Sequence, residues 1–252
     1  MPNVILINQP VPQGNIPIIQ SLFSATVHLL FQHSHAHPNL NCEVRVTYRA
    51  NGPQTRCGGN CDIGYDIDLT AENDDWCKHL YQFSHEACHV FAQYQQAQHS
   101  NQWFEESLCE MSSLYCIKNI AAMGAKDQGP CVDLWAGSSP YHQSLNAYAE
   151  KLINSPDRAC DSDQLQFWLQ RFEMDLRRDP YIRCLNGIIA NRLLDLFMAT
   201  PSNWAAVEFL NVNPCANGQD SFVEYLDNWQ AATPHQYQAL INQVKAMFGL
   251  KA

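Results

Sequence analysis

The stretch FSHEACHVFAQYQQAQHSNQWFEESLCE, residues 83–110, predicts two consecutive helices with several ionisable side chains. Apolar residues recur at helical spacing over 80–94, and a second helical pattern opens at Trp103. The Gln-rich segment 94–102 between them is a polar connection. The fold is therefore expected to contain two neighbouring helices joined by a short link.

The N-terminal part of the chain predicts a small sheet. Short apolar runs at 4–7 and 44–48 indicate strands, with an amphipathic helix over 18–32 between them. The stretch DIGYDIDLT, residues 62–70, alternates apolar with small or polar residues, which is typical of a half-buried strand. Its outer face would be acidic, through Asp66 and Asp68.

The rest of the chain has helical signals. Helices are expected over 74–97, 103–123, 141–154, 163–177, 181–199, 202–211, 219–230 and 234–248. The sequence therefore predicts an α+β protein that is mostly helical, with a small N-terminal mixed sheet. We expect a single domain over 1–252, with an α/β lobe over 1–100 and a helical lobe over 101–252.

Composition narrows the classes of function. The 252 residues are 46% apolar and carry a formal charge of −10, so a phosphate backbone or an anionic membrane would be repelled overall. The first basic residue is Arg45, and polar residues interrupt the apolar stretch 16–31. We therefore expect a cytoplasmic protein that binds neither nucleic acid nor membrane.

Eleven cysteines, at irregular spacing in a long chain, argue against a secreted disulfide framework. Cys57 and Cys61 form the tightest pair, in a glycine-containing loop. Free thiols are the first interpretation, and a redox pair or a second metal site is the alternative.

His85, Glu86 and His89 form an HExxH motif. Residues four apart lie on one face of a helix, so both imidazoles can reach one ion, while Glu86 points toward the open position of the metal. In the next helix, Glu106 suits the role of third ligand, and Glu110 lies one turn further on, where it could accept the free N–H of a ligating histidine.

Other interpretations remain open. The motif could be the solvated face of an amphipathic helix, and a helix start is often acidic because carboxylates favour its positive end. Glu105 lies to the side of the proposed face. His99 could compete as a ligand, and the alternating histidines of HSHAH, residues 33–37, could bind a second metal.

The combination of HEACH and WFEESLCE resembles the gluzincin metallopeptidases, which are thermolysin-like zinc enzymes. The resemblance covers about residues 62–116 and implies a zincin-like fold in which the strand at 62–70 is the edge strand that pairs with substrate. It implies Glu106 as ligand and Glu110 as the outer-shell carboxylate. It also implies a later oxyanion-stabilising group, for which Tyr181 is our first candidate. The other candidates are Tyr141, His142 and His235.

The expected function is zinc-dependent hydrolysis of peptide bonds in a peptide or protein substrate. One Zn²⁺ per chain would lower the pKa of its bound water to about 7, and Glu86 would take the proton. Fe²⁺ fits the same ligands, so a non-haem iron oxygenase is an alternative, as is a binding module stabilised by metal without turnover. The position of cleavage and the oligomeric state are left open.

Overall fold

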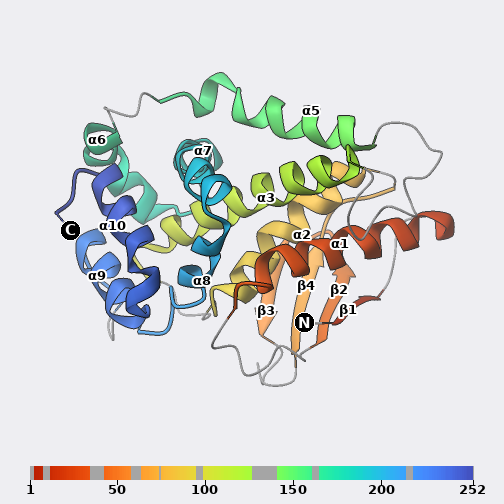
Figure 1. The fold of residues 1–252 in the computed structure, drawn as a ribbon, viewed down its shortest axis with the longest axis horizontal. Coiled ribbons are helices and arrows are strands. Elements are labelled where there is room, and N and C mark those ends of the chain that lie inside the picture. Colours follow the sequence, from red (N-terminus) through yellow and green to blue (C-terminus); the bar gives the residue numbers. More distant parts are fainter. Residues whose placement is uncertain are drawn as a thin grey trace. The chain divides into compact units, whose positions relative to one another are not determined.

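The computed structural model describes residues 3–7, 12–34, 43–57, 64–73, 75–94, 99–126, 141–160, 165–213 and 218–251. These residues are mostly helical, with one small mixed sheet, which confirms the predicted α+β class (Figure 1). They fall into two compact units, each made of two chain segments. The first unit comprises 1–90 and 112–152, and the second comprises 91–111 and 153–252.

A four-stranded sheet lies in the first unit. Its strands are β1 (Asn3–Ile7), β2 (Glu43–Tyr48), β3 (Gln54–Cys57) and β4 (Gly64–Leu69), in the order β1-β2-β4-β3. The pairs β1–β2 and β2–β4 are parallel, whereas β3 runs antiparallel to β4.

The position of β4 corrects one sequence prediction. The strand DIGYDIDLT was expected at the sheet edge, but β4 is paired on both sides, and β3 is the edge strand next to it. The sequence did not predict β3, because its four residues QTRC contain no apolar alternation.

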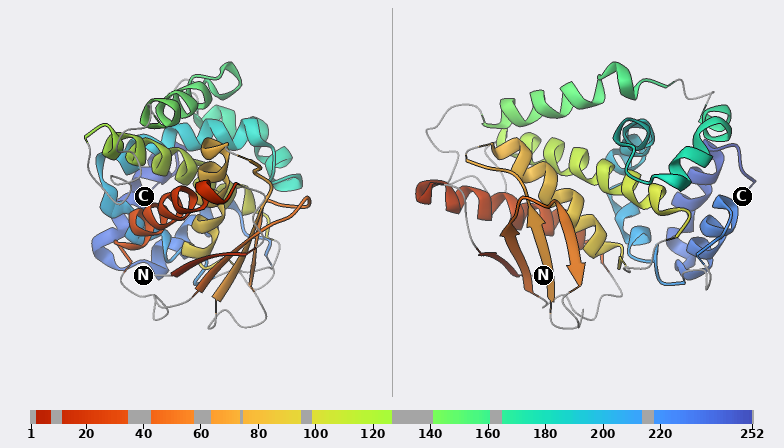
Figure 2. Two further views of the ribbon diagram at one scale, coloured as in Figure 1. Left: turned by 90° about the vertical axis from the view of Figure 1, so that its right-hand side faces the viewer. Right: turned by 180° about the vertical axis from the view of Figure 1, so that it is seen from behind.

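Two helices pack on one side of the sheet, as the two views of Figure 2 show: α1 (Ile16–Phe31) and α2 (Trp76–Phe91). Phe23 of α1 stacks on Phe83 of α2 with ring centroids 4.0 Å apart. The buried strand residues Val44, Val46, Tyr65, Ile67 and Leu69 contribute to this core. Helix α5 (Tyr141–Ile153) also belongs to the first unit.

Asp68 does not form part of a solvated acidic face, contrary to the prediction. Its side chain is fully buried, 3.3 Å from Nε of Arg49 and 2.9 Å from Nη2 of Arg56. Asp66 is half-buried and accepts a hydrogen bond of 2.8 Å from Arg45. The chain therefore neutralises these carboxylates itself, because a buried charge without a partner is strongly unfavourable.

A second buried polar contact joins β2 to α2. The hydroxyl of Tyr48 lies 3.0 Å from Nδ1 of His79, and Nε2 of His79 lies 3.3 Å from the carbonyl oxygen of Asn73. A carbonyl can only accept, so Nε2 carries the proton and Nδ1 accepts from Tyr48. Burial lowers the pKa of His79 and raises that of Tyr48, so this pair is neutral.

The second unit is helical in its described residues. Its helices are the first turns of α3 (Gln102–Gly124), then α6 (Leu165–Arg178), α7 (Arg183–Ala199), α8 (Trp204–Val207), α9 (Phe222–Ala232) and α10 (Gln238–Met247). An aromatic core of Trp103, Phe104, Phe222, Trp229 and Phe248 packs α3 against α9 and the end of α10.

Helices α2 and α3 differ in detail from their predicted form. Helix α2 stops at Phe91, short of the predicted 97, and Gln93 has a φ of 56°, a left-handed conformation that ends a helix. Helix α3 runs from Gln102 to Gly124, one residue longer at each end than the predicted 103–123, and residues 102–117 are all buried. Its polar side chains therefore lie inside the protein and need partners there.

Among the described residues, the helical stretch 13–31 is long and apolar enough to span a membrane by length and composition. The sequence was expected to contain no such segment. Half of this apolar stretch is buried in the fold, and the core helix of a soluble protein has the same length and composition.

Candidate metal centre

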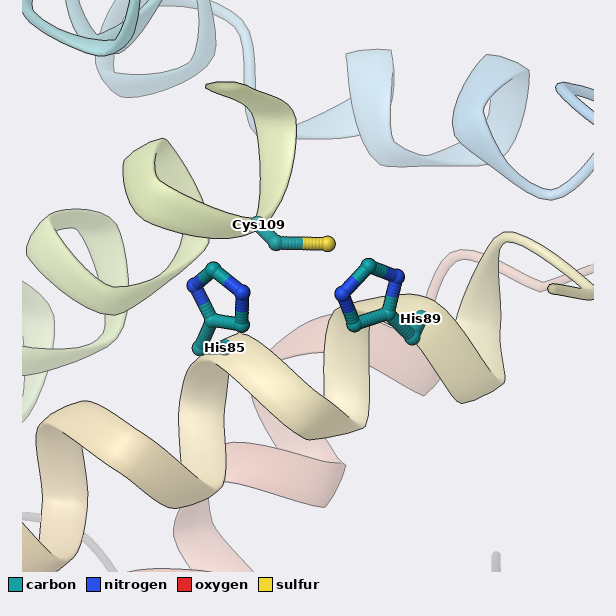
Figure 3. Close-up of side chains that lie close together, drawn as sticks. All are labelled: His85, His89 and Cys109. Carbon is teal, nitrogen blue, oxygen red and sulfur yellow. The ribbon is translucent and has the colours of Figure 1, made fainter. Parts of the chain in front are cut away.

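The two histidines of the motif lie one turn apart on α2, with ring centroids 5.2 Å apart and planes inclined by 69° (Figure 3). His89 is buried and His85 is half-buried. The apolar residues Leu80, Phe83, Ala87, Val90 and Phe91 are buried, as the helical spacing predicted. The solvated amphipathic helix is therefore a poor description of α2.

Glu86 is also buried, at 3% exposure, and contacts the edge strand. The hydroxyl of Thr55 on β3 lies 2.8 Å from Oε2 of Glu86 and 3.0 Å from its carbonyl oxygen. Sequence reasoning missed Thr55, which lies 31 residues from Glu86 in the chain. The predicted base is thus held by a side chain from the sheet.

The three glutamates of α3 have different environments in the second unit. Oε2 of Glu105 accepts a hydrogen bond of 3.0 Å from Asn211, whose amide group also donates to the carbonyl of Ala92. Glu110 forms an ion pair of 2.5 Å with Arg158. Glu106 is 7% exposed. Glu105 is therefore committed to a structural contact, whereas the roles predicted for Glu106 and Glu110 stay predictions.

Tyr181 lies in the turn before α7, near the first turns of α3. Its hydroxyl accepts a hydrogen bond of 3.0 Å from Nε2 of Gln102, which stands one helical turn before Glu106. Burial and the charge of Glu106 raise the pKa of Tyr181, so its hydroxyl keeps its proton at neutral pH. A protonated hydroxyl close to a proposed ligand is what an oxyanion-stabilising group requires.

Cys109 is a further candidate ligand, which the sequence did not single out. One ligand atom from each of His85, His89 and Cys109 lies within 4.8 Å of the others, with the sulfur directed toward the imidazoles (Figure 3). Two imidazoles and a thiolate are a ligand set suited to a divalent transition metal. Cys109 stands three residues after Glu106, and residues three apart share a helix face, so its spacing from Glu106 could have indicated it as a ligand.

The other candidate residues lie elsewhere. His99 stacks on Tyr225 with centroids 5.4 Å apart, and burial lowers its pKa. Tyr141 packs edge-on against Trp76. Cys61 and most of the HSHAH stretch fall outside the described residues, so the redox-pair and second-metal interpretations stay untested.

No family model, curated protein or solved structure matches this chain. The functional assignment therefore depends on the residues themselves. They provide two imidazoles, a buried carboxylate, and further carboxylate and thiol groups, which are residue types able to hold a metal ion and to move a proton.

Proposed function

We propose that this protein is a zinc-dependent hydrolase of peptide bonds, of the gluzincin type. The observation that carries the proposal is the arrangement on α2, where two histidines one turn apart flank a buried glutamate that is held by Thr55. Burying a carboxylate is unfavourable unless it is hydrogen-bonded or paired, and such buried ionisable groups are often found at functional sites.

The donor set fits a divalent metal. His85 and His89 would hold it through imidazole nitrogens, with Glu106 as the third protein ligand and Cys109 as the competing one. When bound, Zn²⁺ supplies Lewis acidity, which polarises a carbonyl and acidifies a water. Two histidines and a carboxylate suit both Zn²⁺ and Fe²⁺, and we propose Zn²⁺ as the bound ion.

The chain's own residues would do the remaining work. Glu86 would accept a proton from the attacking water and pass it to the leaving amine. Tyr181 would donate its hydroxyl proton in a hydrogen bond to the oxyanion, since its oxygen accepts from Gln102 and its O–H can still act as a donor. Glu110 would orient a ligating histidine, sharing its charge with Arg158.

The first test is metal content and hydrolysis by the purified full chain. We expect about one zinc per chain by elemental analysis after anaerobic purification, and cleavage of fluorescein-labelled casein that a chelator abolishes and added Zn²⁺ restores. Glu86→Gln should keep the metal and lose cleavage. Bound iron together with Fe²⁺-dependent oxygen uptake would favour an oxygenase instead.

A second test identifies the third ligand. Glu106→Ala should lose the metal, whereas Glu105→Ala should retain it, because Glu105 is bonded to Asn211. Cys109→Ser should also retain zinc. Loss of zinc in Cys109→Ser with retention in Glu106→Ala would replace the carboxylate by the thiolate as the ligand.

Tyr181→Phe tests the oxyanion role. It should keep zinc and lower kcat by about 100-fold or more, as removal of one such donor does. Tyr148→Phe is the control, because Tyr148 packs edge-on against Tyr81, is not an oxyanion candidate, and should leave kcat unchanged when its hydroxyl is removed.

A further inference from the structure

Thr55 lies in the middle of β3, opposite Ile67 of β4 in the antiparallel register. Residues directly opposite each other point to the same side of a sheet, and Ile67 is fully buried. Thr55 therefore faces the helices, whereas its neighbours Gln54 and Arg56 contact Asp68 on the other side. Valine has nearly the same shape as threonine and is equally favoured in strands, so packing alone does not require a hydroxyl at this position.

The hydroxyl oxygen of Thr55 contacts both ends of one residue. It lies 2.8 Å from the carboxylate oxygen Oε2 of Glu86 and 3.0 Å from the Glu86 carbonyl oxygen. The Glu86 carboxylate must therefore lie near the Glu86 carbonyl oxygen, because both contact the same hydroxyl, and few rotamers of the side chain allow this. The hydrogen bond to Thr55 thus costs Glu86 much of its side-chain conformational entropy.

We propose that Thr55 is a positioning residue for Glu86, and that it holds the carboxylate in the orientation from which it can exchange a proton with water. This inference rests on the proposed function of Glu86 as the base. It assigns a role to a strand hydroxyl that the HExxH motif itself does not include.

A purely structural role would be to tie β3 to α2. Thr26 provides a matched control for it, because its fully buried hydroxyl lies 3.3 Å from that of Ser84 on the same helix. Thr26 therefore ties α1 to α2 through Ser84, two residues before Glu86. Loss of either hydroxyl should affect stability, but only loss of the Thr55 hydroxyl should affect Glu86.

The experiment compares Thr55→Val, Thr55→Ser and Thr26→Val with the wild type, each loaded with Zn²⁺. We expect equal zinc content in all four. Thr55→Val should lower kcat for labelled-casein cleavage by about 10–100-fold with KM unchanged, because a misplaced group costs that much. Thr55→Ser and Thr26→Val should stay within about 3-fold of the wild type, a margin well below that loss.

Crystal structures of the same variants give a readout that does not need activity. The Glu86 carboxylate should leave its position in Thr55→Val and keep it in Thr55→Ser. Thr55→Ala, which also lacks the hydroxyl, replaces Thr55→Val if that variant does not fold.

The outcomes separate the two proposals. An inactive wild type with a displaced Glu86 in Thr55→Val would refute the hydrolase and retain the positioning role. A normal kcat in Thr55→Val, an unmoved Glu86 side chain, or an equal loss of kcat in Thr26→Val would each overturn the role of Thr55.

Discussion

Replacing Arg158 by methionine tests the buried ion pair that holds Glu110. Methionine keeps most of the length of the arginine stem but removes its charge. The side chains of Arg158 and Glu110 are only 9% and 6% exposed, and they lie 2.5 Å apart. Gly187 leaves space for Arg158, since a Cβ there would stand 2.6 Å from its Nε.

The magnitude follows from this burial. Removing one partner of a buried ion pair leaves an uncompensated charge and costs about 3–5 kcal/mol. In a chain of this length each kcal/mol lowers Tm by about 2–4 °C, so we expect a fall of roughly 6–20 °C. The double variant Arg158→Met/Glu110→Gln should recover a large part of the loss, because the unpaired charge is gone.

The assay is thermal and urea unfolding of the metal-free protein at neutral pH, each followed by far-UV circular dichroism, so that both the Tm and the free energy of unfolding are measured. Arg178→Met is the control, because Arg178 and Asp175 pair at 2.8 Å on an exposed surface, which is worth less than about 1 kcal/mol. A loss for Arg158→Met as small as that of the control would refute the buried pair.

Two further predictions concern the first unit. Because burial lowers the pKa of His79, the unfolded chain binds a proton more readily than the folded chain. The free energy of unfolding should therefore fall as the pH drops below about 6.5, the ordinary pKa of histidine. In urea titrations at several pH values, His79→Gln should reduce this dependence on pH. Gly64→Ala should destabilise the protein by about 1–3 kcal/mol, because the added methyl would stand 2.5 Å from the carbonyl oxygen of Glu43. Gly14→Ala is the control: a methyl there has no atom within 4 Å, so this variant should unfold at an unchanged Tm. Equal Tm values for the two variants would contradict the clash at Gly64.

Much of the fold could be predicted because local periodicity determines it. Strands β1, β2 and β4 and helix α1 appear close to their predicted positions, since their apolar residues recur at spacings that a sheet or helix imposes. Strand β3 was missed because hydrogen bonding to β4, rather than its own composition, makes it a strand. The burial of Asp68 was missed for the same reason, since it depends on Arg49 and Arg56.

The candidate site was predictable only in part. The spacing of His85 and His89 dictates that they share a helix face, and the structure confirms this. The contact of Thr55 with Glu86 joins residues from different elements, and no periodic pattern marks it. Likewise, the burial of residues 102–117 in α3 depends on what surrounds them, which the residues themselves do not reveal.

The attachment of Glu86 to β3 has a consequence for motion. A strand hydrogen-bonded on one side only opens locally at a lower free energy than a central strand. When β3 frays, Glu86 is released while α2 stays folded, so the fraction of molecules with an aligned carboxylate depends on this local equilibrium and not on global unfolding. Amide hydrogen exchange in residues 54–57 would measure that fraction directly.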